Sequence, residues 1–306
     1  MAAELRTYGD VSIREDVVMN AITYLTATET QVFNMLGKTT AMSTVHNYLT
    51  DTLATAATAA VAEGSDYTNA TLSTPTRLTN LVEIVAIPFA VTDTQIQVSH
   101  YTGQDELSRQ TEKALKNWGN SAEFDLIRST LVSGVSGTVP KMSGIIEATS
   151  KSTNHTSHTS GTVFSASILD GLMQNQWDNS NGDVATDLLL GSILRKNTDY
   201  FTQKSNVVVN APLSATAIVR TVSTYQTAFS TLSLHSHRYI QQSSDATGRI
   251  LAIRPEMLKV AFLSKPVIDT TLARSGPYQK RAVAGSFTLE VRNQDSHFYA
   301  DGFLKA

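Results

Sequence analysis

The chain has 306 residues and contains no cysteine. This absence excludes a disulfide scaffold, a thiol nucleophile and a cysteine-based zinc site. Charge is also scarce, because Asp, Glu, Lys and Arg make up only 17% of the residues and the formal net charge is −3. Proteins that coat nucleic acid phosphate by phosphate need a strong positive excess, so this charge balance argues against that class of protein.

Long apolar runs are missing as well. No stretch approaches the roughly 18 apolar residues of a membrane-spanning helix, and residues 1–10 do not form a secretory signal. We therefore expect no membrane association and a soluble protein made in a cytoplasm. Hydrophobic residues make up 41%, enough for a sizeable core and, at this length, for about two domains. Many hydroxyls and few charges indicate a surface that packs against other protein, although many extracellular β proteins share this composition.

No catalytic or cofactor motif is present. Gly37-Lys38-Thr39 resembles the end of a phosphate-binding loop, but Val32 stands where the first glycine should be and no strand is expected before it. No pair of carboxylates stands out from ordinary surface acids. We therefore predict a protein that is not an enzyme and has no cofactor. The rival interpretation, an enzyme, would require a cleft with perturbed carboxylates.

Four histidines are the candidates for a metal site: His155, His158, His235 and His237. The first two lie in a polar stretch, KSTNHTSHTSGT (residues 151–162), for which we expect a solvated loop. The other two would share one face of a strand. Together they could supply four imidazoles to one ion. We favour two unrelated pairs and no metal, because no carboxylate or third ligand has matching spacing.

One long helix is expected between Gly103 and Gly134, a segment without proline. An apolar stripe follows its length: Leu107, Ala114, Leu115, Trp118, Ala122 and Leu126. A second stripe, of Phe124, Ile127 and Leu131, occurs only in the second half. The helix should therefore begin at the surface and end buried on two sides. The alternative is two helices broken at Trp118–Gly119.

Charged residues of the first half support the same helix. Asp105 precedes Arg109, and Glu112 precedes Lys116, by four residues each, with the acid first. That order stabilises a helix by a few tenths of a kcal/mol per pair.

Before this helix lies a long arm, residues 40–98. Its return leg, residues 78–89, is strongly β-prone, and Pro88 restricts that leg to a sheet edge or a strand end. Its tip, Ala54–Asn69, has only Val61 and Tyr67 as large apolar residues. The arm is therefore either a disordered loop or a hairpin ordered by lying on a neighbouring subunit.

Helical and β patterns fill the rest of the chain. A capping box at Ser12 and Glu15 opens an amphipathic helix to Leu25, and a shorter helix follows Thr28. After the long helix, the alternation of helices and strands predicts a compact α/β region. The expected segments are helices at 165–177 and 192–201, and strands at 187–190, within 217–240, at 249–253, 260–263, 287–291 and 297–303.

The order of these parts resembles the major capsid proteins of tailed double-stranded DNA phages, which have the Hong Kong 97-type fold, and within them the SU10-like branch. The stretches that carry the resemblance are TETQVFNMLGK, TNLVEIVAIPFAVTDTQIQV leading into GQDELSRQTEKALKNW, YQTAFSTLSLHSHRYI, RILAIRPEMLKVAFL and QKRAVAGSFTLEVRNQDSHFYADGF. Together they span residues 12 to 303, but the likeness is one of pattern and order.

The resemblance implies an α+β fold with four parts. These are an N-terminal helical arm (1–39), an extended β-hairpin arm (40–98), a peripheral domain with a spine helix (99–143 and 271–306) and an axial domain (144–270). It also implies a structural protein that assembles into hexamers and pentamers of an icosahedral shell around packaged double-stranded DNA, in the host bacterial cytoplasm. The alternative is a β-rich phage tail or adhesion protein.

The implied partners are other copies of the chain, together with scaffolding, portal and decoration proteins, and DNA bound without sequence specificity. We expect the interface between copies to include residues from both the arm and the long helix. These residues are Val61, Tyr67, Ile84, Ile87, Phe89, Glu106, Arg109 and Lys113.

Overall fold

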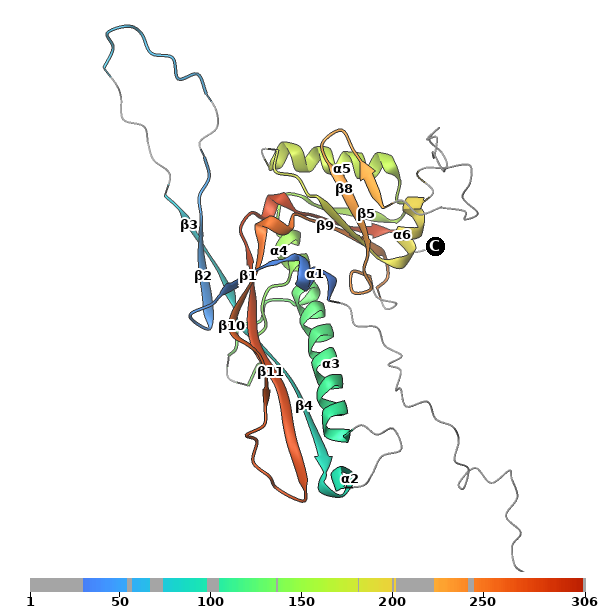
Figure 1. Cartoon of the computed structure of the whole chain (residues 1–306). Helices are drawn as coiled ribbons and strands as arrows, with labels where there is room; N and C mark the ends of the chain where they lie inside the picture. The colour runs from blue at the N-terminus through green and yellow to red at the C-terminus, as the bar shows by residue number, and fades with distance from the viewer. Residues whose placement is uncertain are drawn as a thin grey trace, which may run out of the picture. The chain divides into compact units, whose positions relative to one another are not determined.

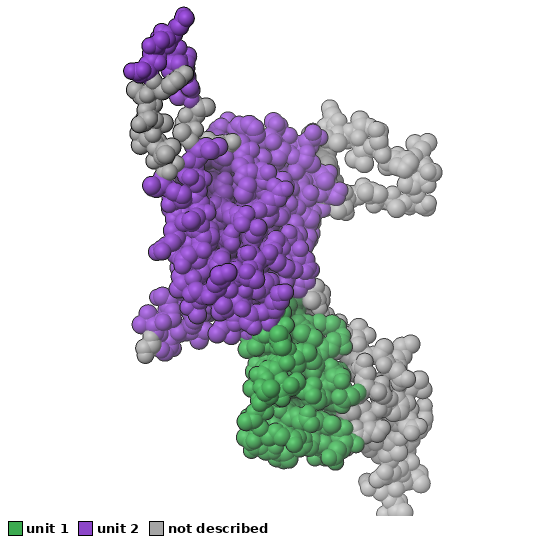
Figure 2. Space-filling view, turned by 60° about the vertical axis from the view of Figure 1, so that its left-hand side comes forward, with its two compact units in different colours: residues 1–29, 86–120, 266–284 green, residues 30–85, 121–265, 285–306 purple. Residues whose placement is uncertain are grey.

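A computed structural model describes residues 30–53, 57–66, 74–97, 105–135, 137–180, 182–199, 201, 223–241 and 245–304. The capping box at Ser12 and Glu15, the helix to Leu25, residues 217–222 and Tyr67 lie outside the described residues. Figure 2 shows two compact units, residues 1–29, 86–120 and 266–284, and residues 30–85, 121–265 and 285–306.

The described chain contains both helices and strands, and they alternate only between β5 and α6 (Figure 1). The α-helices are α1 Gln31–Met35, α2 Asp93–Gln97, α3 Glu106–Arg128, α4 Ile145–Ser150, α5 Ala166–Asn179 and α6 Ser192–Asp199. The strands are β1 Gly37–Thr40, β2 Val45–Thr50, β3 Thr76–Leu81, β4 Glu83–Thr92, β5 His155–Thr162, β6 Asp187–Leu190, β7 Thr224–Gln226, β8 Thr231–Ser236, β9 Gly248–Ile253, β10 Leu258–Asp269, β11 Tyr278–Val291 and β12 Phe298–Phe303. Two 3-10 helices, Pro255–Met257 and Gln294–Ser296, join the last strands.

A four-stranded sheet has the order β1-β10-β11-β4. β1 runs parallel to β10, with Gly37 opposite Lys259 and Thr40 opposite Phe262. The segment that resembled a phosphate-binding loop is therefore a strand of this sheet. β4 is an edge strand, so Pro88, which cannot donate a backbone hydrogen bond, is accommodated there as expected.

A six-stranded sheet has the order β5-β12-β9-β6-β8-β7. Its core is apolar and includes Leu188 of β6, Ile250 of β9 and Phe298 of β12. Leu169, Leu172 and Met173 of α5 and Leu194 of α6 pack into the same core, so both helices cover this sheet (Figure 1). β12 pairs with β5 on one side and with β9 on the other, so the last strand of the described chain belongs to this sheet.

β5 corrects the prediction of a solvated loop at residues 151–162. His155–Thr162 forms a strand parallel to β12, with Tyr299 opposite His155. As the sheet's edge strand, β5 pairs on one side only and tolerates polar side chains. The rings of His155 and His158 pack on Tyr299 and Phe303, at centroid distances of 5.3 and 4.8 Å, which supplies the apolar contact that the sequence pattern did not show.

α3 is one continuous helix through Gly119, so the alternative with a break at Trp118–Gly119 was wrong. The helix ends at Arg128 and is therefore shorter than expected. Ile127 is fully buried as predicted, whereas Leu131 lies beyond the helix and is exposed. Leu115, placed on the apolar stripe, is exposed too.

The charged pairs of α3 are partly as expected. Lys116 and Glu112 form the predicted pair, at 2.7 Å. Arg109 forms an ion pair with Glu106, three residues before it. Asp105 instead accepts a hydrogen bond from the backbone N–H of Ser108 at 3.3 Å. It thereby caps the helix N-terminus, a role for which a short acidic side chain is well suited.

β2 and β3 form the paired base of the arm (Figure 1). They are antiparallel, with Val45 opposite Leu81 and Thr50 opposite Thr76, as the hairpin interpretation requires. Among the described residues, no helix is both long enough and apolar enough to cross a membrane.

Candidate functional site

The base of the arm is fixed by a buried asparagine. Asn80 of β3 donates two hydrogen bonds from its side-chain amide, to the carbonyl of Ser143 (3.1 Å) and to that of Leu289 (2.8 Å). Its side-chain oxygen accepts from the backbone N–H of Ser143 at 2.9 Å. A buried amide with these partners costs free energy to remove, because its partners would be left unpaired. Asn80 therefore holds the arm to β11 and to the loop after α3.

A second anchor lies on β2. His46 contacts the carboxylate of Glu290 at 3.2 Å, and the Tyr48 hydroxyl accepts a hydrogen bond from Val291 N–H at 3.3 Å. Burial would raise the pKa of Glu290, but hydrogen bonds from Arg292 and His46 outweigh burial and hold that pKa below its ordinary value. The carboxylate is thus charged and paired at the foot of the arm.

Beyond these anchors the arm exposes apolar side chains. Every described residue between Ala57 and Asp66 is exposed, including Val61, with 62% of its surface accessible. Leu53 is 98% exposed and Leu49 is also exposed. Ser65 donates two hydrogen bonds to the carbonyl of Ala62, within the same turn. Exposed large apolar residues grouped in one segment mark a surface that binds other protein.

β4 divides the other expected interface residues of the arm between two faces. Its burial alternates, with Glu83, Val85 and Val91 buried. Ile84 points to the opposite face and is 66% exposed. Ile87 and Phe89 share the inward face and are half-buried, so the subunit itself covers part of them.

On α3, Glu106 and Arg109 contact one another, and Lys113 is exposed on the same helix. The ion pair of Glu106 and Arg109 therefore lies within one helix and stabilises that helix locally.

The four histidines do not come together. β5 and β8 are separated by three strands, which at about 4.8 Å per strand spacing puts the two pairs about 19 Å apart. His155 lies 3.9 Å from Asp301. Among the described residues, no three His, Asp or Glu side chains are grouped closely enough to hold a metal ion. The four-imidazole hypothesis was wrong because the sheet order separates the pairs.

His235 and His237 hold α1 instead. Gln31 donates to His235 at 2.7 Å, and His235 in turn contacts Asp187 at 2.9 Å. Tyr239 N–H donates to one ring nitrogen of His237, so the other nitrogen donates to Glu123 at 2.9 Å.

Glu123 is fully buried in α3 and completes this attachment. It also accepts hydrogen bonds from the backbone N–H groups of Val32 and Phe33, at 2.6 and 2.7 Å. Both N–H groups belong to the first turn of α1, where backbone N–H groups have no hydrogen-bond acceptor within the helix. Glu123 therefore connects α1 to α3 and, through His237, to the segment after β8.

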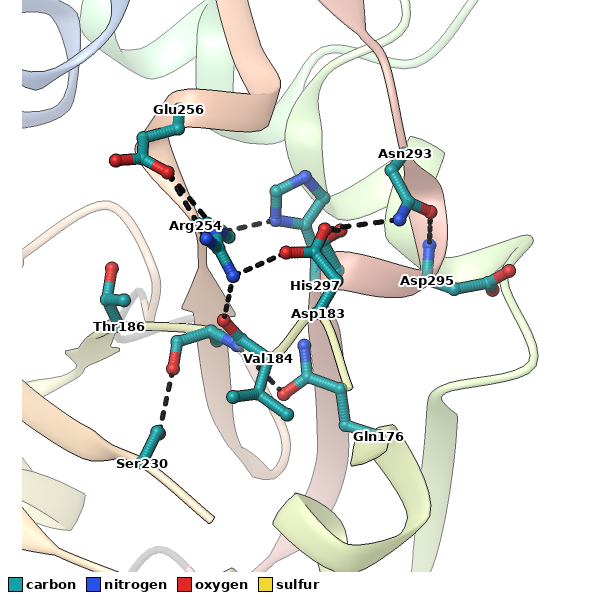
Figure 3. Close-up of polar contacts among 12 residues, drawn as sticks. Gln176, Asp183, Val184, Thr186, Ser230, Arg254, Glu256, Asn293, Asp295 and His297 are labelled. Atoms are coloured by element: carbon teal, nitrogen blue, oxygen red, sulfur yellow. Dashed lines mark hydrogen bonds and ion pairs between the residues drawn. The ribbon is translucent and has the colours of Figure 1, made fainter. Parts of the chain in front are cut away.

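A further polar cluster surrounds Arg254 (Figure 3). Arg254 forms an ion pair with Asp183, which also accepts from Asn293 and Ser296. The backbone N–H of Arg254 donates to His297 at 3.1 Å. Burial lowers the pKa of His297 to about 3, against a smaller opposing effect of Asp183. This histidine stays neutral and cannot serve as a base near neutral pH, so the cluster ties loops together.

Two carboxyl groups interact where β4 begins, the buried Glu83 and the half-buried Asp125. Glu83 accepts from the Ser129 hydroxyl and from Met142 N–H, each at 3.2 Å. Burial first, and then the charge of Glu83, raise the pKa of Asp125 to about 7, although Lys141 opposes the rise. Glu83 is thus held to the loop after α3, and among the described residues no group of three potential metal ligands occurs here.

Solved structures with the same fold are shells. The chain is similar to "Capsid of native GTA particle computed with C5 symmetry", with a TM-score of 0.68, 10% identity and 97% of each chain covered. It is similar to Mycobacterium phage Adephagia, with a TM-score of 0.61, 11% identity and 99% of each chain covered. It also resembles the holo-SrpI encapsulin complex from Synechococcus elongatus PCC 7942, with a TM-score of 0.60, 12% identity and coverage of 98% and 96%.

At such low identity these likenesses establish the fold alone. The chain has the Hong Kong 97-type capsid fold, which confirms the fold class predicted from the sequence. Because a structure described as an encapsulin complex shares that fold, the fold alone does not identify a phage capsid protein.

The sequence, unlike the fold, identifies the family of this chain. The profile of the SU10 major capsid protein family matches residues 6–303, nearly the whole chain. The chain therefore belongs to the SU10 major capsid protein family, whose members are structural proteins of tailed-phage capsids. A search of the curated proteins found no significant match.

Sequence reasoning missed Asn80, Glu123 and Asp125. Each is a polar residue in a segment correctly expected to be β-strand or helix, but nothing in its spacing distinguishes it from a surface residue. Asn80 carries the one available signal, because an amide is unusual within a β-prone run.

Proposed function

We propose that copies of this chain form hexamers and pentamers of a closed icosahedral shell, with packaged double-stranded DNA inside, and that the shell assembles in the host bacterial cytoplasm. Membership of a major capsid protein family is the observation that carries the proposal. The chain works by association and catalyses no reaction. Portal, scaffolding and decoration proteins are its proposed partners.

The arm provides the association in this proposal. Its base is anchored by Asn80, while Leu53 and Val61 remain exposed within the subunit. Ordering each arm residue costs on the order of 1 kcal/mol or more of backbone entropy, and contact with a neighbouring copy can offset that cost. Residues 40–98 are the proposed arm, 99–143 and 271–306 the proposed peripheral domain and 144–270 the proposed axial domain. The interface would include the residues predicted from the sequence: Val61, Tyr67, Ile84, Ile87, Phe89, Glu106, Arg109 and Lys113.

The decisive experiment replaces Ala54–Asn69 with a short Gly-Ser turn. The variant should keep the circular dichroism of the wild-type subunit but stop at monomers or small rings in size-exclusion chromatography. Wild-type protein should form closed shells in negative-stain electron microscopy. Fibres or tubes would instead support a tail or adhesion protein, and normal shells from the variant would refute the role of the arm.

DNA contact should be weak and independent of sequence. The net charge of −3 gives no general attraction to phosphate. Filter binding of disassembled subunits at low salt measures this directly. Nanomolar affinity for one duplex over another would contradict it.

A further inference from the structure

One buried carboxylate joins the end of α3 to the start of β4 and to a segment of the following loop. Glu83 accepts a hydrogen bond from the hydroxyl of Ser129 and another from the backbone N–H of Met142, each at 3.2 Å. The N–H of Gly144 donates to the carbonyl of Ser129 at 2.8 Å. Glu83 is therefore the side chain at which the helix, the strand and the loop meet.

The backbone around Glu83 is closely packed. A Cβ on Gly144 would lie 2.9 Å from the backbone N and O of Ser129 and 3.0 Å from the carbonyl oxygen of Asp125. The loop can approach the helix this closely because glycine has no side chain. Met142, two residues earlier, is fully buried. A change at Glu83 therefore acts on tightly packed backbone.

Asp125 places a second carboxyl group on the same side of the helix. Ser129 lies four residues after Asp125, and its N–H donates to the Asp125 carbonyl at 3.0 Å, so the two side chains share one helix face. Because Ser129 contacts Glu83, that face is the one turned toward Glu83. Asp125 is half-buried, and burial, followed by the charge of Glu83, raises its pKa to about 7.

The surrounding charged groups come from the loop, from α3 itself and from α4. Lys141 of the loop opposes the rise in the pKa of Asp125, but Lys141 is exposed to solvent. Arg128 of α3 is engaged by both oxygens of Asp245, at 2.9 Å each. Glu147 of α4 is bonded to the backbone at the start of the loop. An ionised Asp125 would therefore face Glu83 with the exposed Lys141 as the opposing cation.

We propose that Asp125 and Glu83 form a pH-sensitive latch that holds the loop segment 141–144 against α3 and the start of β4. With a proton on Asp125, the latch is closed and Glu83 keeps its bonds to Ser129 and Met142. Loss of the proton places a second negative charge beside Glu83, and the loop segment separates from it. The latch lies within one subunit, so this inference does not depend on the proposed shell.

The latch should weaken as the pH rises. In the closed form the pKa of Asp125 is about 7, whereas an open form that exposes the side chain to water would restore the ordinary value of 3.8. The closed form thus keeps a proton that the open form releases. The equilibrium constant for opening should increase by up to about tenfold per pH unit between about pH 4 and about pH 7, and then level off.

Hydrogen–deuterium exchange of the full-length subunit measures local opening. The wild type is compared at about pH 5, 6 and 7, after correction for the intrinsic exchange rates. The peptide that contains Met142 should lose protection by about tenfold or more over this range, and by more than a peptide from β9, which reports on the core of the six-stranded sheet. In Asp125→Asn the Met142 peptide should keep the same protection at each pH, because the amide has the size of the protonated acid and no charge. Glu112→Gln, at an exposed acid of the same helix, should behave as the wild type does.

Two results would overturn the latch. If the Met142 and β9 peptides of the wild type lost protection equally, or not at all, Asp125 would not control a local opening. If wild type and Asp125→Asn had the same pH profile, another group would be responsible. Glu83→Gln removes the neighbouring charge and should move the wild-type transition to lower pH. The comparison of the two wild-type peptides decides the matter even if a variant fails to fold.

Discussion

The β2–β3 hairpin of the arm and the six-stranded sheet are both β structure in the same compact unit, but the protein stabilises them in different ways. In the sheet, buried side chains from four strands and two helices form one apolar core, in which Leu188, Ile250 and Phe298 are fully buried. In the arm, β2 and β3 pair only with one another, and side chains such as Leu49 and Leu53 remain exposed. The fixed points of the arm are polar and lie at its base.

This difference indicates what each region needs in order to be ordered. A sheet that buries its own apolar face is stable within one subunit, whereas a two-stranded ribbon is marginal in water. The hydrogen bonds of Asn80 set the direction of the arm without burying its outer part. The sheet should therefore control the stability of the subunit, and the arm should control association.

The largest effect is expected in the sheet core. Leu188→Ala removes a fully buried side chain of β6 and should lower the free energy of unfolding of the isolated subunit by about 2–5 kcal/mol. Leu188→Met keeps the volume and should cost less than about 1.5 kcal/mol. Urea unfolding of both variants measures the difference. Equal stabilities would show that the sheet core does not dominate.

The base of the arm should show an intermediate effect. Asn80→Ala leaves the carbonyl groups of Ser143 and Leu289 without this donor, at a cost of about 1–3 kcal/mol. Asn47→Ala, on the exposed face of β2, is the control and should change stability by less than about 0.5 kcal/mol. If both variants unfolded at the same urea concentration, the polar anchor would contribute nothing.

A pH-dependent effect should arise from Asp125, which lies beside the start of β4. Its pKa is raised from 3.8 to about 7 in the folded subunit, first by burial and then by the charge of Glu83. The folded protein thus keeps a proton that the unfolded chain releases, so this group's contribution to stability falls as the pH rises from about 4 to about 7. Asp125→Asn removes that dependence. Urea unfolding at about pH 5 and about pH 8 should show a larger decrease for the wild type than for the variant; parallel changes would contradict the assignment.

Apolar periodicity predicted much of the fold. The apolar stripe of α3, the run of leucines in β6 and the alternation of Phe287, Leu289 and Val291 in β11 each specify an element through the surface that it buries. Apolar patterns report burial, so they located the elements that form cores.

The sequence analysis did not predict strand β5 or the burial of Glu123, because the residues that contact them lie far away in the sequence. β5 has a polar sequence, and it is a strand because β12 pairs with it across more than 130 residues. Glu123 is buried because Val32, Phe33 and His237 supply donors to it. Leu131 fits the helical period but follows the end of α3. None of these contacts can be inferred from local spacing.

The smallest effect on stability is expected at Leu53, and it separates the two regions most sharply. Its side chain is 98% exposed, so Leu53→Ser removes almost no contact within the subunit and should change the free energy of unfolding by less than about 0.5 kcal/mol. If the arm acts between copies, the same substitution removes apolar surface that a neighbour would bury, and shells should form more slowly or at a higher protein concentration. Light scattering during assembly measures this, with Val163→Ser as the control, because Val163 is also exposed, at 60%, and lies outside the arm. Loss of stability without loss of assembly would place Leu53 in the subunit's own core and reverse the contrast between arm and sheet.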